Sequence, residues 1–169
     1  MPNILLGFCA WLAVLAGNSA PARALSPQDI VGTWKRVSTV RQVVGSNTIV
    51  DNLGPHPGGI LIVTPDLRFV IVETGDGRKP AKTTEEYAAL RTRELAFSGI
   101  ATFSADPDRP NGLKMAGKVD LAWNEEWTGT TQTRFLSVEG NRLTIRTPPS
   151  KNPYTGEMGV STLVWERPR

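Results

Sequence analysis

The chain has 169 residues, the size of one domain, and its 19 lysines and arginines against 16 aspartates and glutamates give a formal net charge of +3. The basic residues are scattered, with no stripe of cations interleaved with aromatic residues, which argues against a nucleic-acid groove. We therefore expect a solvated surface of mixed charge that includes Lys35, Arg36, Arg41, Arg68, Arg78, Lys79, Arg91 and Arg93.

An uncharged run of 14 residues, Ile4–Gly17, lies near the N-terminus. It is shorter than the roughly 20 residues of a membrane-spanning helix, and Ala22-Arg23-Ala24 places small residues where a signal peptidase reads them. We interpret residues 1–24 as a secretory signal peptide and residues 25–169 as the mature domain, with an uncleaved anchor as the alternative. The expected protein is exported, periplasmic or extracellular, and has no transmembrane segment in its mature chain.

The only cysteine, Cys9, lies within the predicted signal peptide. The mature domain therefore has no disulfide to constrain its unfolded chain. Its stability has to come from a hydrophobic core, and roughly 145 residues are enough to form one.

The first predicted strand is Val31–Val44, which is long and rich in β-branched residues. Strict alternation places Trp34 on the same side as Val40 and Val44. Residues 48–50 are candidates to extend this strand after a short turn.

The next two strands form the clearest hairpin of the chain. A loop dense in glycine and proline, residues 52–59, precedes the apolar run Ile60–Thr64. Pro65-Asp66 predicts a tight turn, because proline presets the first turn dihedral. Leu67–Thr74 then returns as the partner strand.

One helix is predicted, and it begins after Thr83. Thr83 and Glu86 have the spacing of a capping box, in which each side chain satisfies a free backbone amide of the first turn. Tyr87, Leu90 and Phe97 can share one helical face. Gly99 is placed as a C-terminal glycine, so the helix is expected to end there.

The rest of the chain predicts short strands separated by turn formers. In Lys118–Trp123, alternation puts Val119, Leu121 and Trp123 on one face. Glu139-Gly140-Asn141 predicts a short hairpin loop. The predicted strands are Ile100–Ala105, Lys118–Trp123, Thr130–Val138, Arg142–Thr147 and Val160–Arg167.

About eight to ten short strands joined mostly by tight turns favour an all-β fold, an antiparallel up-and-down β-barrel with one short α-helix. Closing the sheet removes the exposed edges that an open sheet would present to other chains. An eight-stranded barrel leaves an interior just wide enough for side chains or for one small ligand.

Four segments in order give the chain a resemblance to a known family: Val31–Trp34, Gly59–Asp66, Trp127–Phe135 and Leu163–Arg167. Together they are similar to the lipocalin-like domain proteins of bacteria and fungi, which are small single barrels. The resemblance implies a lipocalin-like barrel that binds a small apolar or amphipathic molecule. The chain lacks the cysteine pair of many secreted lipocalins, so its relationship to those carriers is distant.

Gly32, Trp34 and Arg167 are the candidate residues for barrel closure. In a lipocalin-type barrel, a Gly-x-Trp at the start and an arginine at the end pin the barrel shut. Trp34 would plug one end, with the guanidinium of Arg167 across its indole face as a cation–π contact.

The candidate ligand-binding residues are Arg134, Trp123, Trp127, Phe69 and Phe103. If Arg134 points inward, it can bind a carboxylate or phosphate with two hydrogen bonds; if it points outward, it is a solvated strand charge. Alternation leaves both orientations of Arg134 open, because the apolar Leu136 lies on the same face of the strand as Arg134 and the apolar Phe135 lies on the opposite face. The two tryptophans are placed at a cavity mouth, and the two phenylalanines on its walls, with ordinary core packing as the alternative role.

Catalytic and metal-binding patterns are sparse. His56 is the only histidine, it lies in a loop, and no serine or carboxylate is placed locally to form a triad with it. Without a second histidine or a mature cysteine, the usual ligands of a zinc site are missing. We predict no catalytic residue, no metal and no cofactor.

Three functions fit the predicted barrel: a carrier of a small amphipathic molecule, a cyclase or isomerase that confines its substrate, and a barrel whose outer face binds another envelope protein. A buried carboxyl group with a raised pKa near Arg134 would favour the enzyme. An apolar cavity without such a group would favour the carrier. A cavity filled by side chains would favour the interaction protein.

Overall fold

The computed structural model describes residues 24–51, 53–152 and 155–168. The predicted signal peptide, apart from Ala24, lies outside the described residues, as does Cys9. No helix of the described part has both the length and the apolar character to cross a membrane.

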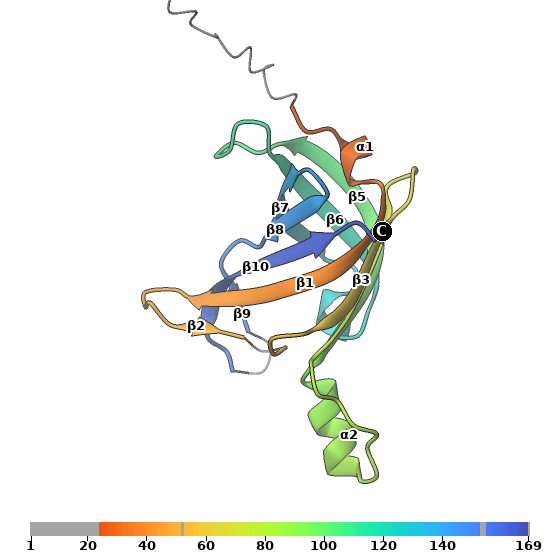
Figure 1. Cartoon of the computed structure of the whole chain (residues 1–169), viewed down its shortest axis with the longest axis vertical. Coiled ribbons are helices and arrows are strands. Elements are labelled where there is room, and N and C mark those ends of the chain that lie inside the picture. The colour runs from red at the N-terminus through yellow and green to blue at the C-terminus, as the bar shows by residue number, and fades with distance from the viewer. Residues whose placement is uncertain (1–23, 52, 153–154, 169) are drawn as a thin grey trace, which may run out of the picture.

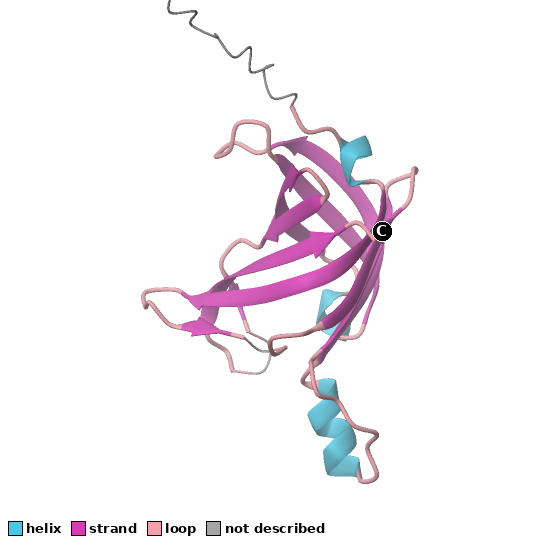
Figure 2. Cartoon of the chain, in the orientation of Figure 1, coloured by secondary structure: helices cyan, strands magenta, loops and turns pink. Residues whose placement is uncertain are grey.

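The described residues form an antiparallel sheet that closes on itself (Figures 1 and 2). Eight strands make the ring, since β1 pairs with both β3 and β10, and two short strands, β2 and β9, extend its margin. This confirms the predicted all-β barrel. The strands are β1 (Gly32–Val43), β2 (Ile49–Val50), β3 (Gly58–Val63), β4 (Arg68–Thr74), β5 (Glu94–Ala105), β6 (Leu113–Ala122), β7 (Thr131–Glu139), β8 (Arg142–Arg146), β9 (Ser150–Lys151) and β10 (Met158–Glu166).

Three short helical segments join or flank the strands. The α-helix α1 (Pro27–Ile30) lies at one end of the barrel, and α2 (Thr84–Arg91) projects from the opposite end between β4 and β5 (Figure 1). A 3-10 turn, η1 (Glu125–Trp127), connects β6 to β7. The hydrophobic core includes Ile30 of α1, so α1 covers the end of the barrel where that core lies.

Both predicted hairpins are present. β3 and β4 pair from Gly58 with Thr74 to Val63 with Phe69, around a turn at Pro65-Asp66. β7 and β8 pair around Gly140, whose φ of 60° is the left-handed conformation that glycine adopts without cost.

The first strand does not alternate as predicted. Trp34 is fully buried, whereas Val40 and Val44 are 41% and 54% exposed. The register against β10 shifts between Arg36 and Ser38, so Val37 is an extra residue. A bulge of one residue exchanges the two faces of everything that follows it.

This bulge also corrects two residues expected on the solvated surface. Arg36 precedes the bulge and lies on the face of Trp34. Arg41 follows the bulge, so an odd-numbered residue now takes the inward face that even-numbered residues take before it. Both therefore point into the barrel, where they are only 4% and 8% exposed. Residues 49–50 pair back onto Arg41 and Gln42 as β2, which makes them a separate short strand rather than an extension of β1.

A second bulge corrects the face predicted for Leu121. β5 pairs Gly99 with Val119 and Ser98 with Leu121, so Asp120 is the extra residue. Val119 is buried as expected, but Leu121 is 68% exposed. β6 also begins earlier than predicted, at Leu113.

The helix is shorter than predicted. Its capping box at Thr83 and Glu86 is present, but α2 ends at Arg91 rather than at Gly99. Residues 94–100 instead pair with β4, which buries Phe97 to 5% exposure. The helix α2 buries no residue. Residues 94–99 therefore gain more stability by packing in the barrel as a strand than they would as further turns of a solvated helix.

Candidate functional site

One end of the barrel is closed around Trp34. Its indole Nε1 donates a 2.8 Å hydrogen bond to the carbonyl oxygen of Ile30. The guanidinium of Arg167 lies over the ring, 4.2 Å from its centroid, and donates to the carbonyl oxygens of Val31 (3.2 Å) and Asp29 (2.9 Å). These are the contacts expected of the Trp34–Arg167 pair.

Gly32 makes room for this arrangement. Its φ of +126° lies in the region that side chains rarely adopt, and a Cβ there would lie 2.6 Å from Nη1 of Arg167. Glycine thus lets the arginine reach across the tryptophan to the chain before the first strand.

A cavity of about 530 Å³ occupies the rest of the interior. Its inner wall includes Leu61, Phe69, Met115 and Leu136, which belong to the core. The lining also includes residues around β9, which lies at the end of the barrel away from α1 (Figure 1). This rim contains Thr147, Pro148, Ser150, Lys151 and Asn152, together with Trp123 and, in η1, Glu126.

Four aromatic side chains form a continuous wall from the core to the rim. Phe69 and Phe97 have ring centroids 5.6 Å apart, Phe97 and Trp127 5.3 Å, and Trp127 and Trp123 5.1 Å, all edge to face. Phe69, Trp123 and Trp127 therefore line the cavity. Edge-to-face pairs favour a fixed wall, since each contributes about 0.5–1.5 kcal/mol beyond its burial.

The fourth predicted ligand residue with an aromatic ring, Phe103, does not line the cavity. The cavity wall takes Glu94, Leu95 and Phe97 from the start of β5, whereas Phe103 lies near the end of that strand, opposite Met115 of β6. Phe103 packs instead against the core cluster.

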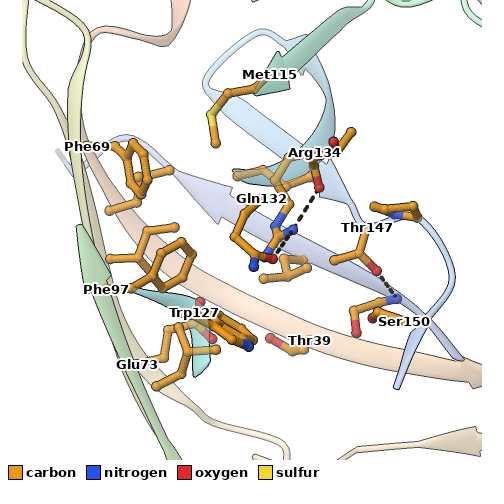
Figure 3. Close-up of a pocket in the computed structure, with 18 of the residues that line it drawn as sticks. Thr39, Phe69, Glu73, Phe97, Met115, Trp127, Gln132, Arg134, Thr147 and Ser150 are labelled. Atoms are coloured by element: carbon orange, nitrogen blue, oxygen red, sulfur yellow. Dashed lines mark hydrogen bonds between the residues drawn. The ribbon is translucent and has the colours of Figure 1, made fainter. Parts of the chain in front are cut away.

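Arg134 points into the cavity, which decides between the two orientations left open by the sequence (Figure 3). It pairs with the buried Met115 of β6 and shares its face with Leu136, which is 2% exposed. Its Nη1 donates to the carbonyl oxygen of Thr133 (2.7 Å) and to Oε1 of Gln132 (3.5 Å). The guanidinium carbon lies 5.9 Å from the ring centroid of Phe97.

The surroundings of Arg134 are costly for a charge. Burial lowers the pKa of its guanidinium to about 10, and attraction to Glu73 offsets part of that effect. Arg134 is nevertheless a cation at neutral pH. Arg134 therefore places a fixed positive charge in a mostly apolar cavity.

An ion pair between Arg36 and Glu73 lies in the barrel wall, and the sequence analysis missed it. Both side chains are almost completely buried, and Glu73 reaches the cavity lining. The guanidinium of Arg36 also lies over the ring of Trp165, 3.8 Å from its centroid. Burial raises the pKa of the Glu73 carboxyl group, while the adjacent Arg36 opposes that rise.

The signal for this pair was present in the sequence. Glu73 follows Phe69 and Ile71 at a spacing of two, so alternation puts it on the inward face of its strand. Arg36 follows Trp34 in the same way. Two opposite charges on inward faces predict a buried pair, because an unpaired buried charge is strongly disfavoured.

A third inward cation, Arg41, lies nearer the rim. It donates to Oγ of Ser161 (3.1 Å), to the carbonyl oxygen of Glu157 (3.2 Å) and to that of Ser150. All three acceptors are neutral. Burial lowers the pKa of Arg41, and Glu157 partly opposes this.

His56 is exposed in the loop before β3 and does not line the cavity. Within the described residues, no group of three histidine, cysteine, aspartate or glutamate side chains is placed to hold a metal ion. The cavity thus offers apolar and aromatic surface with a few fixed charges.

Comparison with known proteins gives one family. Residues 31–168 match the family model described as a lipocalin-like domain, which covers most of the chain and every strand of the barrel. No curated protein matches the chain significantly.

Proposed function

Because this chain belongs to the lipocalin-like domain family, we propose that it is an exported protein that holds one small apolar or amphipathic molecule in its barrel cavity. The observation that carries the proposal is the cavity of about 530 Å³. Sites for small molecules are clefts of roughly 300–1,000 Å³ with mostly apolar walls and few polar groups.

The size of the cavity also weighs against a barrel that only binds another protein through its outer face. An eight-stranded barrel can be filled completely by its own side chains. Here Gly99 and Gly117 make room for the ring of Phe69, which would lie 2.9 Å from a Cβ at either position. The space between the aromatic wall and Arg134 nevertheless remains open.

Export is supported by the predicted signal peptide, residues 1–24. On this proposal the mature protein is periplasmic or extracellular. N-terminal sequencing of the protein recovered outside the cytoplasm should begin at Leu25. Recovery of the intact N-terminus in the cytoplasmic fraction would contradict export.

A second candidate function, an enzyme, is favoured by Glu73. Its carboxyl group is 3% exposed, lines the cavity and interacts electrostatically with Arg134. A carboxyl group with a raised pKa is suited to proton transfer. The carboxylate of Glu73 is already engaged in an ion pair with Arg36, so we propose ligand binding ahead of catalysis.

Native mass spectrometry of the mature protein purified from its own envelope tests the binding proposal. We expect a mass excess that denaturation releases as one small amphipathic molecule. A bare mass, before and after incubation with an envelope lipid extract, would contradict the carrier. If the released molecule is chemically converted by the protein and Glu73→Gln stops the conversion without loss of binding, the enzyme is the correct function.

A further inference from the structure

We propose that the cavity selects amphipathic molecules with an anionic headgroup, and that Arg134 binds that headgroup. This inference rests on the proposed binding function and adds to it the chemical class of the ligand.

Three carboxylates line the cavity: Glu73 and Glu94 have cationic partners, and Glu126 lies in η1. Glu73 pairs with Arg36, and Glu94 pairs with Arg91 (3.0 Å) and Arg78 (3.4 Å). Among the described residues, no carboxylate lies within ion-pair distance of Arg134. Arg134 is therefore a cavity-lining guanidinium without a carboxylate partner among the described residues, and Arg41 nearer the rim is another.

The hydrogen bonds of Arg134 leave donors available. Both of its bonds to described residues use Nη1, and no described residue accepts from Nη2 or Nε. A guanidinium has five N–H groups in a planar fork that matches a carboxylate with two parallel bonds. The free edge of the guanidinium is thus ready for an anionic group from a ligand.

The apolar wall continues inward from Arg134. Phe97 lies beside the guanidinium, and Phe69, Met115 and Leu136 lie deeper. Figure 3 shows Arg134 and Gln132 extending into the space between Phe69 and Phe97 on one side and Thr147 on the other. A ligand can therefore place its headgroup on Arg134 and its apolar part against the phenylalanines.

Arg134 supplies one positive charge beside the apolar wall, so it can neutralise one negative charge of a headgroup. Arg41 nearer the rim also has no carboxylate within ion-pair distance among the described residues, but it directs its donors to neutral oxygens. Its charge adds positive potential that also favours an anion over a neutral or cationic ligand.

Calorimetric titration of the ligand-free mature protein with three ten-carbon probes tests the inference. The probes are decanoate, decanol and decyltrimethylammonium, used below their aggregation concentrations at about pH 8, where decanoate is ionised. We expect decanoate to bind at least about tenfold more tightly than decanol, and the cationic probe to bind weakest, because charge-assisted hydrogen bonds favour the anion.

Arg134→Met is the matched variant, since it keeps an unbranched apolar stem and removes the charged guanidinium. We expect its affinity for decanoate to fall by about tenfold to a hundredfold, with decanol within about threefold of the original protein. Arg146→Met removes an exposed arginine from the outer face of β8 and should leave both affinities unchanged. The fluorescence of Trp123 and Trp127 reports occupancy of the same cavity.

The outcomes separate the two proposals. Equal binding of decanoate and decanol would overturn the anion selectivity and leave the binding function standing. Binding of none of the probes would overturn both. A decanoate preference that survives Arg134→Met would overturn the role of Arg134. If that variant does not fold, Arg134→Gln replaces it, and the comparison of probes on the original protein still decides the selectivity.

Discussion

At the scale of single residues, the three inward arginines are stabilised in different ways. Arg36 pairs with the carboxylate of Glu73 and lies over the indole ring of Trp165. Arg41 donates hydrogen bonds to three neutral oxygens. Arg134 has one short hydrogen bond to a backbone carbonyl and a long one to an amide. Perturbed charges of this kind concentrate at functional sites, because a ligand can supply the missing partner.

Arg134→Met should stabilise the ligand-free protein. Burial lowers the pKa of Arg134 to about 10, well below its ordinary value, so the charged form is disfavoured in the fold. Because a lowered pKa penalises the cation, the cost is present at every pH below about 10 and is relieved only above it. We expect a gain of about 1–3 kcal/mol in the free energy of unfolding, because a difference of one pKa unit corresponds to about 1.4 kcal/mol.

Urea denaturation at neutral pH measures this gain. Arg146→Met, on the outer face, should change stability by no more than about 0.5 kcal/mol. A loss of stability in Arg134→Met would show that the charge contributes to the fold rather than to a site.

Sequence patterns predicted part of the site at this scale. Phe69 lies on the inward face of a regular strand, so its place in the cavity followed from alternation. The face of Arg134 did not, because Leu136 and Phe135 are apolar on opposite faces of the same strand. The pairing of Arg134 with Met115 decides it, and this contact joins two strands whose register the sequence does not reveal.

At the scale of elements, two bulges determine which side chains face the cavity. The bulge at Val37 turns Arg41 inward and Val40 outward. The bulge at Asp120 turns Leu121 outward, while Oδ1 of Asp120 accepts a 2.6 Å hydrogen bond from Oγ of Ser98 on the outer face. Alternation cannot detect an extra residue, and this is why the predicted faces of Val40 and Leu121 were wrong.

Gly99→Ala tests the second bulge. A Cβ at Gly99 would overlap the carbonyl oxygen of Lys118 and lie 2.8 Å from its carbonyl carbon, so the backbone of β6 would have to move. We expect a loss of at least about 2 kcal/mol in the free energy of unfolding. Thr102→Ala, at an exposed position of the same strand, should cost less than about 1 kcal/mol.

Thermal and urea unfolding of these two variants give the comparison. Equal stability of Gly99→Ala and Thr102→Ala would mean that β5 and β6 do not approach as closely as the structure places them. The helix prediction was wrong at this same residue. Gly99 was expected to end a helix, but it lies in β5, where the close approach of β6 leaves no room for a side chain.

At the scale of the whole molecule, the barrel divides into a packed end and an open end. Trp34, Trp165, Leu143 and Ile30 are at most 1% exposed. The other end contains the cavity and its rim. The closed antiparallel barrel was predictable because turn formers and strand lengths recur along the chain, but which inward positions pack and which line a cavity depends on contacts between distant strands.

Trp34→Ala should therefore destabilise the protein much more than Trp127→Ala. Trp34 is fully buried, hydrogen-bonded to Ile30 and covered by Arg167, so its removal leaves a void in the packed end of the barrel. Truncation of a buried tryptophan costs roughly 3–5 kcal/mol. Trp127 is only partly buried and borders space that is already open, so its removal creates little new void.

Urea unfolding should show the larger loss of stability for Trp34→Ala, whereas decanoate titration should show the larger loss of affinity for Trp127→Ala. Similar melting of the two variants would contradict the division into a structural end and a binding end.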